Sequence, residues 1–358
     1  MDNPVVSLLK GGKKAMNANM VYVTSAGIMT GTKTNAREKY LKIDPKCYEA
    51  FLEKFQIRNV DRISKISLAA AAMTLMKRNI LDPSFNIERG KDNDYGIVFG
   101  TQYSALESIH NYDIEALEKG ALAVNPGLFP NTVLNSPACQ ISIQCSFAGP
   151  VYTVCNGLTS SLDAIGMGYN FVKAGLSSMV LAGGVDEITE LQTKMQSNDK
   201  HLGEASGFIM LESERTITEN TKLAKILAYK SIALNKEQRT SMSETVSSLI
   251  LDAVTSGESS IVDITSISLA SAFSYHESNN VLSEICKKMN YHGNKECVKT
   301  DWMGACGILQ TYKALKATNG KMETFVLLNI ENGRAAAVVL RTYKWPSSKN
   351  YGGYYHEK

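Results

Sequence analysis

The residues most suited to chemistry lie in one stretch, FAGPVYTVCNGLTSSLDAIGMGY, residues 147–169. Its pattern predicts a buried strand that turns sharply into a helix, a place where enzymes often mount a nucleophile. A thiolate at a helix N-terminus is stabilised by free backbone N–H groups and by the helix dipole. Cys155 lies in this stretch, but toward the end of the strand rather than at the head of the helix. We therefore expect Cys155 to be a buried, inaccessible structural thiol.

Other residues with reactive side chains are scattered along the chain. The seven cysteines are odd in number and never spaced as CxxC, so they give no zinc pattern and predict small buried thiols in a reducing compartment, Cys139 and Cys145 among them. The glycines of GMGYNFVKAG and LAGGV lack a phosphate-cradling pattern and predict tight turns and helix packing. No alternative catalytic triad is visible among the five histidines, His110, His201, His276, His292 and His356.

An α/β scaffold must position these residues. Short apolar runs predict buried strands and amphipathic runs predict helices between them. Strands are expected at 20–31, 94–101, 151–155, 177–189, 205–213, 222–234, 266–272 and in a final hairpin over 324–343. Helices are expected at 61–80 with Asp61 as N-cap, 103–120, 158–174, 241–255, 279–290 and 304–320, closed by Gly320. This alternation predicts two similar α/β halves, 20–220 and 221–343, and a tail, 344–358.

Residues 125–150 interrupt the alternation. They hold four of the eight prolines, which fit neither a central strand nor a helix interior. We expect mostly loop here, with a short helix or strand at ACQISIQC.

Composition limits the compartment and the partners. The chain has 358 residues and is 44% hydrophobic, enough for a large core. Charged residues make up 20% with both signs mixed, and the net charge of +3 gives no nucleic-acid signature, although a mildly basic patch could receive an acidic protein. No run approaches the roughly twenty apolar residues of a membrane span, and the first residues lack the apolar core of a signal peptide. We expect a soluble, cytoplasmic protein with neither nucleic acid nor membrane as partner.

The stretch at 147–169 resembles the segment GP-x-x-x-V-x-x-A-C-x-S-S-L of the β-ketoacyl synthase family, the condensing enzymes of fatty acid and polyketide assembly. Gly149, Pro150, Val154 and Ser160 to Leu162 carry the match. Five further segments agree in the same order: DRISKISLAAAA, GIVFGTQYSALES, FPNTVLNSPACQISIQCSFAGP, VLAGGVDE and GEASGFIMLES. The likeness implies the thiolase fold, in which two repeated α/β halves form α-β-α-β-α layers.

At the positions where the family carries its catalytic residues, this chain has other residue types. Counted without a gap from the GP pair, the nucleophilic cysteine falls on Leu158. The first histidine position falls near Ala272 or Phe273, and the second, aligned on GACG, falls on Asp301. The family's N-x-F-G-F-G-G-x-N loop is shortened to NIENGRAA. Leucine cannot be acylated, and an aspartate anion would repel the enolate that a neutral histidine stabilises, so the resemblance implies the fold without its catalytic machinery.

A chain of this kind resembles the chain-length factor, the β-subunit of the ketosynthase in type II polyketide synthases. Leu158 departs from the glutamine that is common there. The resemblance implies an obligate heterodimer with an active ketosynthase, no cofactor or metal of its own, and an acyl chain carried on the phosphopantetheine of a separate acyl carrier protein. It also implies a substrate tunnel for an aromatic polyketide or a polyene, with wall candidates on the helix at 103–117: Ser108, Asn111, Tyr112 and Glu115.

Two other interpretations remain open at this point. The chain could be an active acyl-thioester transferase with Cys155 as nucleophile, which requires a three-residue slip that loses the register of the serines and leucine. It could also be a homodimeric, non-catalytic binding protein of the thiolase fold. Copurification with a ketosynthase separates the subunit from the homodimer, and acylation of Cys155 would identify the transferase.

Overall fold

The computed structural model describes residues 19–32, 39–53, 55, 57–82, 94–195, 200–218, 221–318, 321–331 and 333–343. The tail predicted at 344–358 and the helix-closing Gly320 lie outside these residues. Within the described part of the chain, no helix is long and apolar enough to cross a bilayer.

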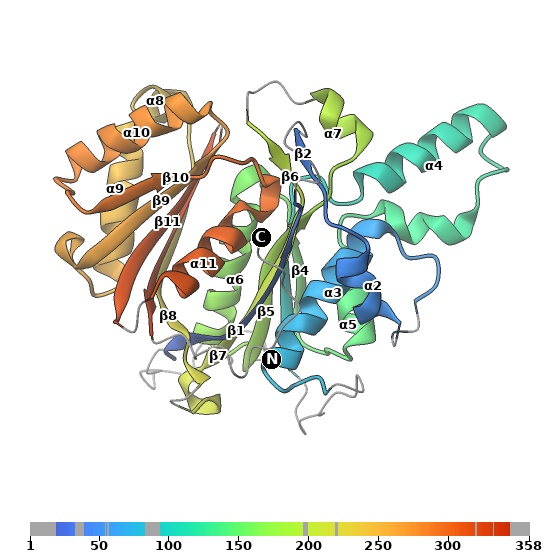
Figure 1. Ribbon diagram of the computed structural model, residues 1–358, viewed down its shortest axis with the longest axis horizontal. Helices are drawn as coiled ribbons and strands as arrows, with labels where there is room; N and C mark the ends of the chain where they lie inside the picture. Colours follow the sequence, from blue (N-terminus) through green and yellow to red (C-terminus); the bar gives the residue numbers. More distant parts are fainter. Residues whose placement is uncertain are drawn as a thin grey trace, which may run out of the picture.

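Ten strands of the described residues join in one sheet, in the order β10-β9-β11-β12-β8-β1-β7-β5-β3-β4 (Figure 1). Five come from the first half of the chain: β1 (Val21–Thr30), β3 (Gly96–Gly100), β4 (Val151–Val154), β5 (Met179–Asp186) and β7 (Ala205–Ser213). Five come from the second: β8 (Ala224–Ala233), β9 (Ile264–Ser271), β10 (Asn294–Cys297), β11 (Glu323–Glu331) and β12 (Arg334–Thr342). A small separate sheet pairs β2 (Tyr40–Leu41) with β6 (Leu202–Gly203).

The two sets of five strands are arranged in the same way. The strands of each set can be numbered in chain order. Read from the outer edge of the sheet to the junction of the two sets, both then have the order third, second, fourth, fifth, first. In both, the third, second and fourth strands are parallel, and the fifth is antiparallel to its two neighbours. The sets meet where β1 pairs with β8 over three residue pairs, Val21–Val23 with Ala224–Ile226. The chain is therefore built from a repeated α/β unit.

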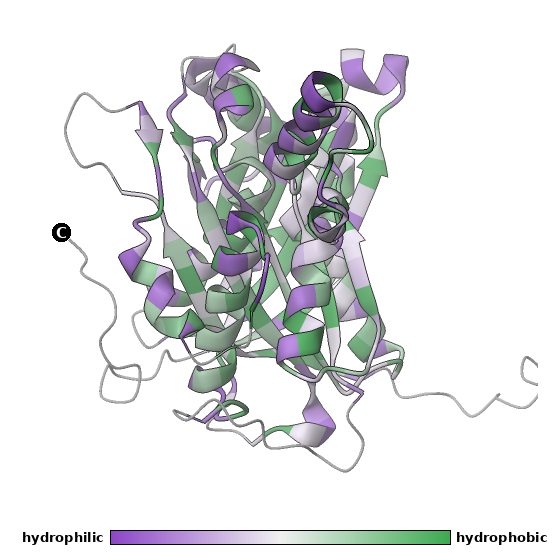
Figure 2. Ribbon diagram, turned by 90° about the vertical axis from the view of Figure 1, so that its right-hand side faces the viewer, coloured by the Kyte–Doolittle hydropathy of each residue, from purple (hydrophilic) through white to green (hydrophobic). Residues whose placement is uncertain are grey.

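Helices cover the sheet in layers (Figure 1). On the outside of the first set lie α3 (Arg62–Lys77) and α5 (Ser136–Gln144), and on the outside of the second lie α9 (Met242–Ser256) and α10 (Tyr275–Lys288). Two helices, α6 (Ser160–Lys173) and α11 (Cys306–Ala317), lie between the two sets and contact strands of both. Figure 2, seen from the side of α4 (Leu106–Lys119), shows the hydrophobic colour concentrated in the strands and the hydrophilic colour on outer helices.

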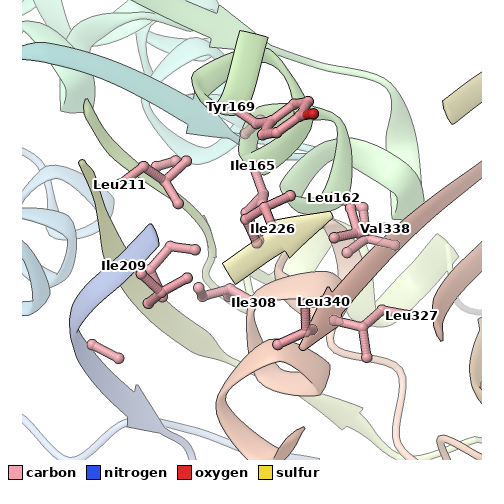
Figure 3. Packing of buried hydrophobic residues seen from close by; sticks show 14 of the residues in the cluster. Leu162, Ile165, Tyr169, Ile209, Leu211, Ile226, Ile308, Leu327, Val338 and Leu340 are labelled. Carbon is pink, nitrogen blue, oxygen red and sulfur yellow. The ribbon is translucent and has the colours of Figure 1, made fainter. Parts of the chain in front are cut away.

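The apolar centre forms around α6. Leu162, Ile165 and Tyr169 lie one helical turn apart and face residues of both halves in Figure 3. Their partners are Ile209, Leu211, Ile226, Ile308, Leu327, Val338 and Leu340, all in one buried cluster. Because this core is shared, each half buries its inner face against the other.

Local signals explain where most helices begin. Asp61 caps α3, since its side chain accepts the N–H of Ser64, as the sequence predicts. The helix expected at 279–290 starts earlier, because Ser274 and Glu277 form a capping box at the head of α10. The ambiguous ACQISIQC segment lies largely within α5. The remaining described helices are short: α2 (Lys46–Leu52), α7 (Glu190–Met195), α8 (Lys236–Thr240) and the 3-10 helices η1 (Pro126–Thr132), η2 (Gly157–Thr159), η3 (Glu214–Thr216), η5 (Ile261–Asp263) and η6 (Met303–Ala305).

Candidate functional site

The site lies at the head of α6, beyond the carboxyl ends of the parallel strands. The 3-10 helix η2 leads into α6, and its first residue, Gly157, has a φ of 64°. This is the left-handed region, which glycine enters without steric cost. Leu158 follows and is only 3% exposed. Its side chain packs with residues of the second half, Ala270, Val298 and Cys306. A hydrocarbon side chain therefore lies at the position to which the family resemblance assigns the nucleophilic cysteine.

Polar side chains of the same stretch hold this turn. The hydroxyl of Ser160 accepts the N–H of Asn156 (2.9 Å) and donates to the carbonyl of Thr101 (2.7 Å). Asp163, in the first turn of α6, accepts from Asn156 Nδ2 and Thr159 Oγ1, both at 2.8 Å. A carboxylate at this position is also favoured by the helix dipole. Ser160, one of the residues that carry the family resemblance, thus helps to hold the turn.

The main chain of Leu158 is held at both ends by β11. Its N–H donates to Oε2 of Glu331 (2.6 Å), and its carbonyl accepts from Nδ2 of Asn329 (3.0 Å). Burial raises the pKa of Glu331, the hydrogen bond from Leu158 opposes that rise, and the Asp301 carboxylate adds to it. Sequence reasoning missed both residues, although both stand in the shortened segment NIENGRAA.

Asp301 and Lys200 bring further charges to this end of the sheet. Oδ1 of Asp301 accepts the N–H of Met303 (2.9 Å). Lys200 is 4% exposed and donates from Nζ to the carbonyl of Ser271 (2.6 Å). Burial lowers the pKa of Lys200, while the charge of Asp301 raises it. No motif in the sequence pointed to Lys200, because its role depends on where the chain after α7 returns to the sheet.

Phe273 and Leu158 pack in different apolar clusters. Phe273 packs against the apolar cluster between the second set of strands and the outer helices α9 and α10. His276, which follows it closely, is exposed and contacts Asn280 (3.2 Å). The region after β9 therefore presents no imidazole to the head of α6.

Asp186 joins the loops around the site. It ends β5, is fully buried, and accepts from Thr101 Oγ1 (2.8 Å) and from the N–H groups of Gln102 (2.8 Å), Tyr103 (2.9 Å) and Gly304 (2.8 Å). Burial raises its pKa to about 6, and these hydrogen bonds limit the rise. Asp186 therefore connects the loop after β3 with the turn before α11.

The expectation for Cys155 is wrong. The residue is exposed, and its Sγ lies 3.3 Å from the carbonyl of Gln102. The reason is that β4 is the last strand of the sheet, so its outer side has no neighbour. Partial burial of the sulfur and the carboxylates of Asp186 and Glu331 all raise the pKa of Cys155. The thiol is accessible, but its surroundings disfavour the reactive thiolate.

The other cysteines divide between core and surface. All seven are free thiols. Burial was predicted correctly for Cys145, Cys286 and Cys306, while Cys47 is exposed and Cys139 and Cys297 are partly exposed.

The tunnel candidates lie on α4, a helix without a buried residue. Ser108 donates its hydroxyl to Oδ2 of Asp61 (3.2 Å). Tyr112 meets Phe129 edge to face, with ring centroids 6.1 Å apart. Asn111 is exposed, and Glu115 forms an ion pair with Lys119 (3.0 Å). α4 extends away from the sheet in Figure 1.

Within the ranges that the structure describes, no three His, Cys, Asp or Glu side chains are grouped so that they could hold a metal ion.

Comparisons with solved structures show the fold. The ishigamide ketosynthase/chain length factor matches with a TM-score of 0.72 at 15% identity, covering 91% of this chain and 100% of that chain. A type II PKS acyl-carrier protein in complex with its ketosynthase, bound to the hexaketide, matches with a TM-score of 0.70 at 14% identity and the same coverage. The large mixed sheet with its helical layers is that of the thiolase-like ketosynthases.

Sequence comparisons show the family. The 3-oxoacyl-(acyl-carrier-protein) synthase 2 of Vibrio cholerae is 24% identical over 187 residues, 52% of this chain and 44% of that protein. Nodulation protein E of Rhizobium sp. is 24% identical over 135 residues, 38% of this chain and 32% of that protein. The matched part spans less than half the length of these curated relatives. The model of the β-ketoacyl synthase N-terminal domain matches residues 8–213, more than half of the sequence, and the chain therefore belongs to the β-ketoacyl synthase family.

Proposed function

We propose that this chain is a non-catalytic subunit, similar to a chain-length factor, which pairs with an active ketosynthase of a type II polyketide synthase and shapes the tunnel for the growing chain. The observation that carries the proposal is Leu158, buried at the head of α6 where the family resemblance places the nucleophilic cysteine. Leucine has no atom that can form a thioester. The chain therefore depends on a partner for the covalent step.

The charges around Leu158 support the same conclusion. Condensation develops negative charge on an enolate oxygen, which needs hydrogen-bond donors or positive charge nearby. Here the N–H of Leu158 already donates to Glu331, and Asp301 is the residue that the family resemblance aligns with the second histidine. Enzymes of this family take their substrates from the phosphopantetheine of an acyl carrier protein and use no cofactor of their own. The carrier protein is accordingly proposed to deliver its chain to the partner.

An apolar surface supports a protein partner. Of the fifteen large apolar side chains that are exposed among the described residues, nine fall between residues 114 and 152. They lie on the neighbouring elements α4, η1, α5 and β4 and on the links between them, and form what we call the 114–152 patch: Ile114, Leu117, Leu122, Leu128, Phe129, Val133, Leu134, Ile143 and Tyr152. β4 is an open sheet edge beside this patch. Monomers rarely expose such a surface, and an open edge invites pairing with another strand.

A transferase that uses Cys155 is the second candidate, because the exposure of this thiol makes it accessible. Its raised pKa speaks against it, since the thiolate is the nucleophilic form.

Coexpression tests the subunit. The proposal predicts that a neighbouring reading frame encodes a ketosynthase with a cysteine and two histidines at the family's catalytic positions. The chain is produced alone and together with that ketosynthase. We expect a stable one-to-one complex and condensation from malonyl carrier protein only in the coexpressed sample. A stable, soluble monomer or homodimer that does not bind the ketosynthase would contradict the proposal.

Mass spectrometry tests the missing nucleophile. After incubation with acetyl or malonyl carrier protein, the intact mass of this chain should show no acyl adduct, while the ketosynthase becomes acylated at its cysteine. A stoichiometric adduct on Cys155 would instead establish the transferase.

A further inference from the structure

The repeated unit offers an internal comparison for the head of α6. Because both halves share one strand order, β5 corresponds to β11, and α6 corresponds to α11. Both central helices begin with a three-residue 3-10 turn, η2 and η6. The first residue of each turn has a positive φ, 64° at Gly157 and 53° at Met303. The second residues, Leu158 and Gly304, are therefore equivalent.

Both equivalent N–H groups donate to a carboxylate from the opposite half. Gly304 donates to Oδ2 of Asp186 (2.8 Å), the last residue of β5. Leu158 donates to Oε2 of Glu331 (2.6 Å), the last residue of β11. The two contacts form a reciprocal pair across the shared core. In the second half the carboxylate holds a structural turn at the start of α11. The turn at the start of α6 is held in the same way.

We propose that Glu331 is a positioning residue that keeps thioesters away from the head of α6 in this chain by occupying the N–H of Leu158. This inference rests on the proposed function and deepens it. One N–H that donates to a carboxylate is not available to an acyl oxygen or a thiolate at the same place. The negative charge also cancels the field of the helix N-terminus that would otherwise activate a nucleophile there. Two residues, Leu158 and Glu331, then prevent thioester chemistry at the head of α6, and not the leucine alone.

The packing around the carboxylate supports this role. A Cβ on Gly157 would lie 1.9 Å from Oε2 of Glu331, so the close approach requires glycine at this position. Asn329, two residues before Glu331 on β11, is fully buried and holds the carbonyl of Leu158. Other charged or titratable groups that line this end of the sheet are Tyr103, Cys155, Asp186, Lys200, Asp301 and Cys306.

The test installs a thiol and measures its reactivity. Leu158→Cys is made in a Cys155→Ala background, with and without Glu331→Gln, in the full chain in complex with its ketosynthase. Alkylation by iodoacetamide is followed by peptide mass spectrometry across pH. We expect a thiol pKa above the ordinary value of about 8.5 when Glu331 is present. Glu331→Gln should lower this pKa by at least one unit and raise alkylation at pH 7 by about threefold to tenfold. Glu323→Gln, at the other end of β11, is the matched control and should change neither.

The possible outcomes separate the two proposals. The role of Glu331 would be overturned if the thiol at position 158 is reactive with Glu331 intact. It would also be overturned if Glu331→Gln leaves the pKa of that thiol unchanged. Neither result would affect the proposed subunit role. Acylation of the natural chain would overturn the proposed function itself. If Glu331→Gln fails to fold, Glu331→Asp withdraws the carboxylate by one methylene and should raise alkylation by a smaller factor. An unchanged alkylation rate in Glu331→Asp would then count against the inference.

Discussion

At the scale of single residues, Arg62 holds two carboxylates at the head of α3. Its Nη1 lies 2.7 Å from Oε1 of Glu204 and 3.2 Å from Oε2 of Glu187. Glu204 is fully buried and Glu187 is 6% exposed. Burial raises the pKa of Glu187 to about 7, although the charge and hydrogen bond of Arg62 oppose the rise. One guanidinium thus serves two acids.

Glu187→Gln should change how stability depends on pH. The folded pKa of Glu187, about 7, exceeds the ordinary 4.5. Below pH 4.5 Glu187 is protonated in both the folded and the unfolded state, and its contribution to the free energy of unfolding is fully present. This contribution is lost as the pH rises through 7, and the total loss is at most about 3 kcal/mol. We expect Glu187→Gln to remove this loss. The free energy of unfolding of the variant, measured with urea, should therefore rise relative to that of the natural protein between pH 5 and pH 8.

Glu190→Gln is the control for that experiment. Glu190 is exposed and its hydrogen bond and ion pair with Lys194 lower its pKa, so it titrates below the window. Parallel pH profiles for Glu187→Gln and the natural protein would show that Glu187 ionises normally.

Ser108→Phe tests the proposed tunnel wall. Ser108 is partly buried and contacts Asp61. Overpacking a rigid wall costs about 1–3 kcal/mol, which displaces a chain end more readily than it unfolds a large dimer. We expect the complex with the ketosynthase to release products with fewer extensions, while the rate of the first condensation is little changed.

Glu118→Phe, at an exposed position of the same helix that is not one of the patch residues, is the matched control and should leave product length unchanged. Unaltered products from Ser108→Phe in an intact complex would remove Ser108 from the wall.

At the scale of elements, α3 depends on its N-cap. Asp61→Ala removes the acceptor for the Ser64 N–H and the partner of the Ser108 hydroxyl. Loss of such a cap costs about 1 kcal/mol. Asp61→Asn keeps an acceptor oxygen and should cost much less, which urea unfolding of both variants measures. Equal losses would show that the charge, and not the cap, matters.

Strands and helices were largely predictable because their signals are local. Each expected strand is present, with ends that shift by at most three residues, and Asp61 is recognisable as a cap from its place before an apolar helical run. The contact between Leu158 and Glu331 was not predictable in the same way. These residues are 173 positions apart, and their meeting depends on how the two halves pack.

The error at Cys155 also has a cause at this scale. Local sequence indicates that residues 151–155 form a strand, but not that the strand is the last one of the sheet. An interior strand would have covered the residue that follows it. Which strand becomes an edge is a property of the assembled topology.

At the scale of the whole molecule, the 114–152 patch predicts self-association. Expressed alone, the chain should form dimers or larger species at micromolar concentration, because the apolar patch and the open edge seek a partner. Phe129→Asp, at a 55% exposed position, should lower the molar mass measured by light scattering during size exclusion toward that of the monomer. It should also weaken the complex with the ketosynthase.

Val262→Asp is the control for this experiment. Val262 is 85% exposed but lies in η5 of the second half, far along the chain from the patch. Equal effects of the two substitutions would show that general apolar exposure, and not this patch, drives association.

The sheet has two unlike ends, and this difference limits how far an assembly can grow. β4 carries Tyr152, a member of the 114–152 patch, whereas β10 carries exposed Lys295 and Glu296. When β4 pairs with the same edge of a partner of like fold, both edges are used and growth stops at two chains. A fibre would require β4 of one chain to meet β10 of the next and to bury two charged side chains. The charges on β10 therefore protect a chain with an open edge from endless polymerisation.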